Sequence, residues 1–143
     1  MHILVIDDDV SVGTAIQALL SRENCEVTFV QDGALGVQAF GKSRFDAVIV
    51  DIFMPRLDGF EIIEVFRQQD PTVPIIAMSG FRYREANGSA PDFLAMAVKL
   101  GATCCLAKPF GPRQLMMAVN ACRDNAGSTI TPPAPDSVRG VPQ

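Results

Sequence analysis

The sequence has few of the residues that usually bind soft metals. It contains one histidine, His2, and four cysteines, Cys25, Cys104, Cys105 and Cys122. These cysteines lack the paired spacing of zinc ligands, and the histidine has no cysteine near it in the sequence. We therefore interpret all four cysteines as free, buried thiols of a reducing compartment, with redox sensing as the alternative.

The sequence also lacks a long hydrophobic run and an excess of positive charge. Its 143 residues are 48% apolar, yet no run approaches the roughly 20 residues that span a bilayer. A strand-like run follows Met1 without a basic segment or cleavage site. We therefore expect no signal peptide, no membrane contact and a cytoplasmic location. The net charge of −4 disfavours nucleic acid as a partner.

Apolar runs of strand length alternate with segments of helical periodicity along most of the chain. Strands are expected at roughly 2–7, 26–30, 47–50, 74–78 and 103–107. Five strands that alternate with five helices predict right-handed βαβ units and a doubly wound parallel sheet. Because the site of such a sheet lies beyond the carboxyl ends of its strands, polar residues at those ends are candidate functional residues.

The helices between these strands differ in the strength of their signals. The second, over residues 33–42, is expected to be weak because Gly36 interrupts it. The fourth is expected to begin near Ser89 and to stop at Gly101, and the last to begin near Pro112. Residues 126–143 are rich in proline and lack periodicity, so we expect a single domain over 1–125 and a disordered tail.

Polar residues stand where the expected strands end. Asp7 and Asp8 follow the first strand, and Asp51 follows the third. Ser79 and Lys108 hold the matching positions after the fourth and fifth strands. Two carboxylates about 4 Å apart repel by roughly 4 kcal/mol near a protein surface. Such a cluster indicates a bound cation, and hard oxygen ligands suit Mg²⁺.

Four sequence motifs, in this order and spacing, resemble the receiver domain of two-component response regulators. They are LVIDDD, VIVDIFMPRLDGFE, IIAMSG and GATCCLAKPF, within residues 1–125. The resemblance implies a flavodoxin-like (βα)5 fold with strand order 2-1-3-4-5. It also implies that the chain takes a phosphoryl group from a kinase phosphohistidine onto an aspartate, a residue type that acts as a covalent nucleophile in phosphoryl transfer.

The resemblance assigns roles to the acidic residues. Asp51 matches the phosphoacceptor, and Asp7 and Asp8 match the acidic pair that holds Mg²⁺. Asp8 is expected to bind the metal directly and Asp7 through water. Asp51 and the backbone carbonyl of Phe53 would complete the protein ligands. Asp9, in contrast, is expected to act as a loop acid or helix cap.

The resemblance also covers the phosphoryl-binding residues and shows two departures. Ser79 matches the hydroxyl and Lys108 the cation that contact the new phosphoryl group, and the bond Lys108–Pro109 is cis in the family. Cys105 stands where the family usually has a Tyr or Phe whose rotation reports phosphorylation. The segment between Ser79 and Gly101 is also longer than the family norm. Because a thiol cannot replace the aromatic ring, we expect phosphorylation to be reported by movement of the polar loop over residues 80–88, or by little conformational change at all.

These observations favour a stand-alone phosphoacceptor that catalyses only its own phosphorylation and dephosphorylation. Its expected partners are a sensor histidine kinase or histidine phosphotransfer protein and an unidentified output protein, because the segment after the last helix is too short for an output domain. The alternative is a phosphatase of the haloacid dehalogenase type with Asp7 as its nucleophile, since Asp7, Asp9 and Ser11 fit its D-x-D-x-S/T pattern. That family needs a further acidic pair, which is not found, and it gives no role to Asp51.

Overall fold

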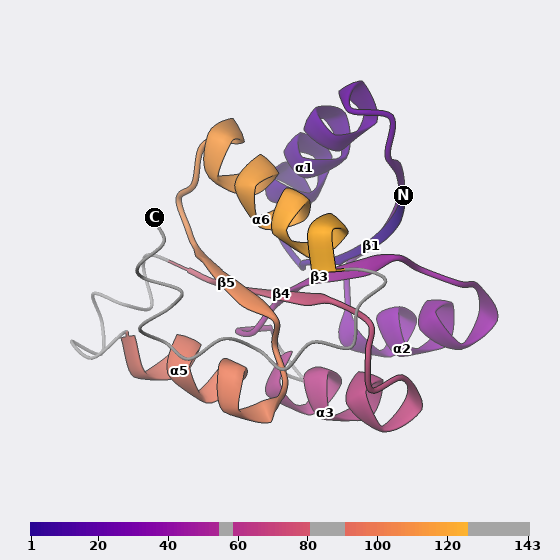
Figure 1. The fold of residues 1–143 in the computed structure, drawn as a ribbon, viewed down its shortest axis with the longest axis vertical. Coiled ribbons are helices and arrows are strands. Elements are labelled where there is room, and N and C mark those ends of the chain that lie inside the picture. The colour runs from indigo at the N-terminus through magenta and orange to yellow at the C-terminus, as the bar shows by residue number, and fades with distance from the viewer. Residues whose placement is uncertain (55–58, 81–90, 126–143) are drawn as a thin grey trace.

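A computed structural model describes residues 1–54, 59–80 and 91–125, which form a five-stranded parallel sheet between two layers of helices (Figure 1). The strands are β1 (His2–Ile6), β2 (Glu26–Val30), β3 (Ala47–Asp51), β4 (Ile75–Ser79) and β5 (Cys104–Ala107). The helices are α1 (Val10–Arg22), α2 (Gly33–Lys42), α3 (Gly59–Gln69), α5 (Pro91–Leu100) and α6 (Pro112–Asn125).

The strand order is β2-β1-β3-β4-β5, with every neighbouring pair parallel. This confirms the flavodoxin-like order that the sequence resemblance implied. The strand ends differ from the expected ones by at most one residue. Asp51 and Ser79 are themselves the last residues of β3 and β4, because the ladder between the strands extends through both of them.

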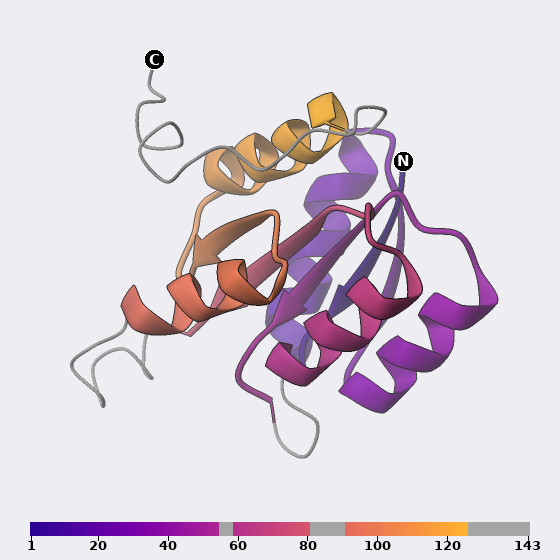
Figure 2. The same ribbon diagram turned by 60° about the horizontal axis from the view of Figure 1, so that its bottom comes forward.

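Successive side chains of each strand point to opposite faces of the sheet, so the core is divided between the two helical layers. In β1, Ile3 and Val5 face the side covered by α1 and α6, whereas Leu4 and Ile6 face α2, α3 and α5 (Figure 2). All four side chains are completely buried. Burial of such a side chain stabilises a fold by roughly 1.5 to 3 kcal/mol. The continuous apolar runs therefore form strands because both faces of the sheet are covered.

Aspartates cap the first two helices, and α2 is continuous. Asp9 accepts hydrogen bonds from the backbone N–H groups of Ser11 and Val12, as expected for a helix cap. The interruption expected at Gly36 does not occur, because this glycine lets α2 lie against β1. A Cβ atom there would lie 2.4 Å from the Cδ1 atom of Ile6.

The ends of the later helices agree with the expectations wherever the structure describes them. Gly101, with φ of +121°, follows α5 and ends it, and Pro112 begins α6. The expected start of α5 at Ser89, most of the loop over residues 80–88 and the tail 126–143 lie outside the described residues. Over residues 1–54, 59–80 and 91–125, no helix is long and apolar enough to cross a membrane.

Candidate functional site

The carboxyl edge of the sheet brings the expected polar residues together. Asp7 follows β1, and Asp51 and Ser79 end β3 and β4. Lys108 follows β5, and its backbone N–H donates a 2.8 Å hydrogen bond to the carbonyl of Ser79. These residues come from four separate parts of the sequence, so the parallel register of the strands is what places them at one edge.

Three carboxylates at this edge can share one metal ion. Oxygen atoms of Asp7, Asp8 and Asp51 all lie within 4.8 Å of one another. Asp7 and Asp51 are buried, whereas Asp8 is exposed. Backbone N–H groups fix the two buried carboxylates: that of Asp9 donates to Asp7 at 2.8 Å and that of Phe53 to Asp51 at 2.9 Å. An all-oxygen donor set with one solvent-facing member fits a hard divalent cation.

Lys108 neutralises part of this negative charge. Its Nζ atom lies 2.7 Å from Asp7 Oδ2 and 3.2 Å from Asp51 Oδ2. Burial lowers the pKa of Lys108, but the carboxylates of Asp51 and Asp7 outweigh this effect and hold the pKa above its ordinary value. The side chain is therefore an ammonium at neutral pH. The peptide bond Lys108–Pro109 is cis, as the resemblance implied.

The Asp51 carboxyl has an unusual ionisation. Its burial raises the pKa from 3.8 to about 6, and Asp7 adds to this rise. Lys108 and the backbone N–H of Phe53 act in the opposite direction and keep the shift from being larger. At neutral pH the group is mainly ionised, which is the form that attacks phosphorus.

The Ser79 hydroxyl is buried without a partner. The residue is 1% exposed, and its Oγ atom is the one buried side-chain N or O atom without a hydrogen bond among residues 1–54, 59–80 and 91–125. A buried hydroxyl without a partner costs about 1 to 3 kcal/mol. Its position at the end of β4 gives it a partner only if another group enters the site.

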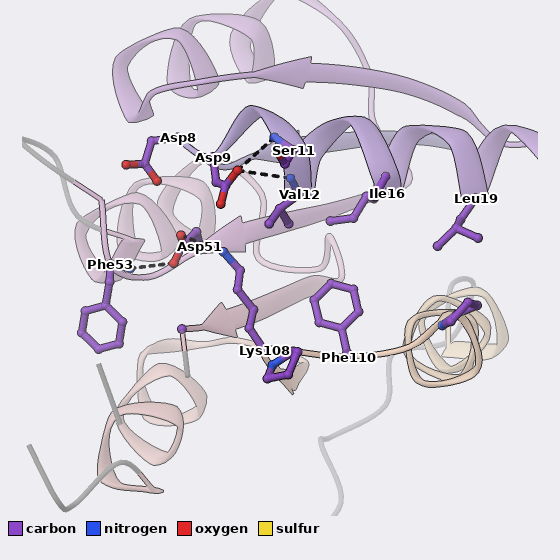
Figure 3. A pocket seen from close by; sticks show the side chains of 14 residues that line it. Asp8, Asp9, Ser11, Val12, Ile16, Leu19, Asp51, Phe53, Lys108 and Phe110 are labelled. Carbon is purple, nitrogen blue, oxygen red and sulfur yellow. Dashed lines mark hydrogen bonds and ion pairs between the residues drawn. The ribbon is translucent and has the colours of Figure 1, made fainter. Parts of the chain in front are cut away.

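A pocket of about 1100 Å³ opens beside these residues (Figure 3). Asp8, Asp51 and Lys108 line one part of it, and the first turns of α1 and the turn after β5 line another. The apolar side chains of this second part are Val12, Ala15, Ile16, Leu19, Pro109, Phe110 and Pro112. Sequence reasoning missed these residues. The available signal was that α1 begins directly after the acidic run and must therefore flank the site.

The remaining candidates have structural surroundings. The Nε2 atom of His2 lies 2.9 Å from Thr28 Oγ1, and its ring packs against Phe45, so it is an ordinary strand residue. Cys105 is half-buried on the α5 side of β5 and packs against the apolar cluster there. Burial, together with the neighbouring Cys104, raises the pKa of Cys105 to about 12, so it stays a neutral thiol.

Comparison with known sequences identifies relatives of this chain. The profile of the response regulator receiver domain matches residues 3–120. The transcriptional regulatory protein PrrA of Mycobacterium bovis is 34% identical over 130 residues, which are 91% of this chain and 53% of that protein. The regulatory protein VirG of Agrobacterium fabrum is 36% identical over 118 residues, 82% of this chain and 44% of that protein. The chain thus spans about half the length of these curated relatives.

Solved structures give the same result. A response regulator receiver domain protein from Clostridium thermocellum is 28% identical, with a TM-score of 0.78 over 87% of this chain and 94% of that one. The chemotaxis protein CheY4 of Vibrio cholerae is also 28% identical, with a TM-score of 0.75 over 85% of this chain and 97% of that one. These matches do not favour the haloacid dehalogenase alternative, and the chain belongs to the response regulator receiver domain family of two-component signalling.

Proposed function

We propose that Asp51 is the phosphoacceptor of this receiver domain. The observation that carries the proposal is the contact of one ammonium group, that of Lys108, with Asp51 and Asp7 at the carboxyl edge of the sheet. This leaves a buried, ionisable nucleophile beside a fixed positive charge. Phosphoryl transfer depends mainly on positioning and on neutralising charge on the phosphoryl oxygens.

The donor is the phosphohistidine of a sensor histidine kinase or of a histidine phosphotransfer protein. An Asp51 carboxylate oxygen attacks the phosphorus, the phosphorus–nitrogen bond breaks, and the imidazole leaves with the bonding electron pair. The Phe53 N–H group holds one Asp51 oxygen and thereby orients the carboxylate. Receiver domains interact with histidine kinases, and the pocket beside Asp51 leaves space for the donor.

Two side chains stabilise the product. Lys108, already 3.2 Å from Asp51, pairs with a phosphoryl oxygen once the aspartyl phosphate forms. Ser79 donates its hydroxyl hydrogen to another phosphoryl oxygen, which supplies the partner that its buried Oγ atom otherwise lacks. Hydrogen bonds to charged acceptors are roughly twice as strong as neutral ones.

The same acids would hold Mg²⁺. Asp8 and Asp51 are proposed as direct ligands together with the backbone carbonyl of Phe53, and Asp7 as a ligand through water. When bound, Mg²⁺ would supply positive charge that neutralises the phosphoryl oxygens. Asp7 is buried and already bonded to Lys108 and to the Asp9 N–H group, which suits an indirect role, whereas Asp8 is exposed.

We infer that the output of residues 1–125, as one receiver domain, is contact with another protein. Curated relatives carry names of transcriptional regulators, but this chain has a net charge of −4, and phosphorylation adds further negative charge. Direct binding of nucleic acid by these residues is therefore disfavoured. Catalysis by the chain is limited to its own phosphorylation and dephosphorylation.

Acetyl phosphate tests the phosphoacceptor. The protein with Mg²⁺ and acetyl phosphate should gain one phosphoryl mass in intact-mass spectrometry, and Asp51→Asn should abolish the gain. Asp9→Asn is the matched control, because Asn also caps helices and should leave labelling intact. Labelling that survives Asp51→Asn but is lost in Asp7→Asn would contradict the proposal and favour the phosphatase alternative.

Asp8→Ala tests the metal assignment. This variant should lose Mg²⁺ binding, measured by titration calorimetry, and with it acetyl phosphate labelling. Because the exposed Asp8 adds to the repulsion between the acids, removing it should not lower the thermal midpoint in EDTA. An unchanged Mg²⁺ affinity would contradict the role of Asp8.

A further inference from the structure

The pocket beside Asp51 has a charged end and an apolar end. Its charged lining residues are Asp8, Asp9, Asp51 and Lys108, all at or just after the carboxyl ends of strands. The apolar lining comes from the first turns of α1 and from the turn after β5. In Figure 3 the apolar side chains extend from Lys108 along α1, away from Asp8. A molecule held at the charged end can therefore place an apolar group against α1.

The surface of α1 that borders the pocket carries no charge. Over residues 10–21 the helix contains no charged residue, and Arg22 is its single one. Of the residues that line the pocket, Val12 and Leu19 are half-buried and Ala15 is exposed. The solvent-facing side of a helix usually carries polar and charged residues, and contiguous exposed apolar surface marks a binding site. This side of α1 is therefore suited to contact with an apolar group.

Phe110 forms the wall of the pocket on the side of β5. Its ring is half-buried, packs against the apolar cluster covered by α1 and α6, and follows Lys108 by two residues. Lys108 Nζ lies 3.2 Å from Asp51 Oδ2. One short turn thus supplies both the cation beside the proposed nucleophile and an aromatic surface next to it.

The pocket has the size and the lining of a small-molecule site. Its volume of about 1100 Å³ is slightly above the roughly 300 to 1,000 Å³ of typical ligand pockets. Such pockets have mainly apolar walls and a few polar groups that fix the orientation of the ligand. The pocket can therefore hold a whole phosphodonor, with its phosphoryl group at the charged end.

We propose that the apolar end of the pocket binds the leaving group of the phosphodonor, so that acyl phosphates with a bulky apolar acyl group are preferred substrates. The inference rests on the proposed role of Asp51 and names a substrate class for the same site. Ala15 and Phe110 determine the preference, because they line the pocket from its two sides. The methyl group of acetyl phosphate covers little of this surface.

The reaction is a phosphoryl transfer from an acyl phosphate to Asp51. A carboxylate oxygen of Asp51 attacks the phosphorus, and the bond between the phosphorus and the acyl oxygen breaks. The acyl group leaves as a carboxylate with the bonding electron pair, so that no proton is transferred. Contact between the apolar end and the acyl group adds binding energy from a part of the substrate that does not react, which raises kcat/KM.

Two acyl phosphates that differ in their apolar group test the proposal. The full chain with Mg²⁺ is incubated with acetyl phosphate or benzoyl phosphate, and initial rates of phosphoryl addition are measured by intact-mass spectrometry. Benzoate and acetate are leaving groups of similar basicity, so a difference in rate reports contact with the protein. We expect the second-order rate constant for benzoyl phosphate to be at least about tenfold larger. Asp51→Asn should abolish labelling by both donors.

Two substitutions on the surface of α1 locate the contact. Ala15 and Ala18 are both exposed, but only Ala15 lines the pocket. Ala15→Gln should lower the ratio of the benzoyl to the acetyl rate constant about fivefold or more, because the amide occupies the apolar end. Ala18→Gln, the matched control, should keep the wild-type ratio. Phe110→Ala should lower the ratio in the same way, and the Ala15 variant decides the question if this one fails to fold.

The outcomes separate this inference from the phosphoacceptor role. Labelling of Asp51 with equal rate constants for the two donors would overturn the preference and leave the phosphoacceptor role in place. A preference for benzoyl phosphate that Ala15→Gln does not reduce would also overturn the inference, because the acyl group would then bind elsewhere. Failure of both donors to label Asp51 would contradict the proposed function and the inference together.

Discussion

A single lysine contacts two buried carboxylates of this receiver domain. Lys108 is 101 residues from Asp7 and 57 residues from Asp51 in the sequence, yet its ammonium group hydrogen-bonds to both. The three charges leave a net negative site, and Asp51 compensates by holding its proton more tightly than an exposed aspartate does. The ionised carboxylate of Asp51, the proposed nucleophile, therefore lowers the stability of the fold. Positive charge brought by Mg²⁺ would reduce this cost.

Asp51→Asn should stabilise the protein in a pH-dependent way. The folded-state pKa of about 6 lies above the ordinary 3.8, so this group destabilises the fold progressively as pH rises between these values. Asparagine cannot ionise. The variant should therefore be more stable at neutral pH by about 3 kcal/mol. Urea unfolding in EDTA between pH 4 and 7 measures this, and a stability difference that does not change over this range would contradict the prediction.

Ser79→Ala should leave the stability of the unmodified protein unchanged or slightly raised. The Ser79 hydroxyl is buried without a partner, so its removal breaks no hydrogen bond. Thr103→Ala is the matched control, because Thr103 Oγ1 accepts a 3.0 Å hydrogen bond from the Ile75 N–H group. The control should lose about 1 to 2 kcal/mol.

The effect of Ser79→Ala should appear when the site is loaded. Beryllofluoride, a phosphoryl mimic, should raise the thermal midpoint of the wild-type protein more than that of Ser79→Ala. Equal increases in the two proteins would show that the hydroxyl does not contact the phosphoryl group.

Among the elements, α3 begins directly against the backbone that follows β3. Gly59 begins α3, and its N–H group donates to the carbonyl of Ile52 at 3.2 Å. A Cβ atom at Gly59 would lie 2.3 Å from the Cα atom of Ile52 and 2.6 Å from the carbonyl oxygen of Asp51. Because these are backbone atoms, a side chain at Gly59 cannot be accommodated without moving the strand end that carries Asp51.

Two glycine-to-alanine substitutions should therefore have opposite effects. Gly59→Ala should lower the free energy of unfolding by about 1 to 3 kcal/mol or more and slow acetyl phosphate labelling. Gly41→Ala, in α2, meets no atom within 4 Å and should stabilise the protein by up to about 1 kcal/mol. Chemical denaturation and labelling rates of both variants check this, and equal effects would contradict the packing argument.

Across the whole molecule, the end of α5 and the start of β5 are fixed to α3 by one side chain. Arg67 donates to the carbonyl of Gly101 at 2.9 Å and to Thr103 Oγ1 at 3.4 Å. Cys105, two residues later, is too small to act as the rotating aromatic ring that the family usually has at this position. Because of these two features, we expect conformational change to occur away from the start of β5.

Amide hydrogen exchange should show where the conformational change occurs. On addition of beryllofluoride, we expect the largest changes in amide protection over residues 80–91, most of which lie outside the described residues, and smaller changes over 103–106. Asp51→Asn should show neither change if it no longer binds the mimic. Changes centred on 103–106, with none over 80–91, would contradict the prediction.

The sequence alone determined the fold class and the polar edge of the sheet. Uninterrupted apolar runs such as residues 47–50 predict strands covered on both faces, and parallel strands bring their carboxyl ends to one edge. These signals are readable because they are local patterns of side-chain polarity. The continuity of α2 was not readable, because the fit of Gly36 against Ile6 depends on how closely a helix approaches a distant strand.

Only the tertiary structure decided which side chains interact. The sequence places Asp7, Asp51, Ser79 and Lys108 at one edge of the sheet, but it does not show that Lys108 bonds to both aspartates or that the Ser79 hydroxyl lacks a partner. These contacts join residues of different elements, and the missing contact depends on the space left between elements. Strand register and helix packing set both the contacts and that space. Hydrophobic burial fixes that geometry without regard to the polar groups it brings together, so their pairing follows from the completed fold.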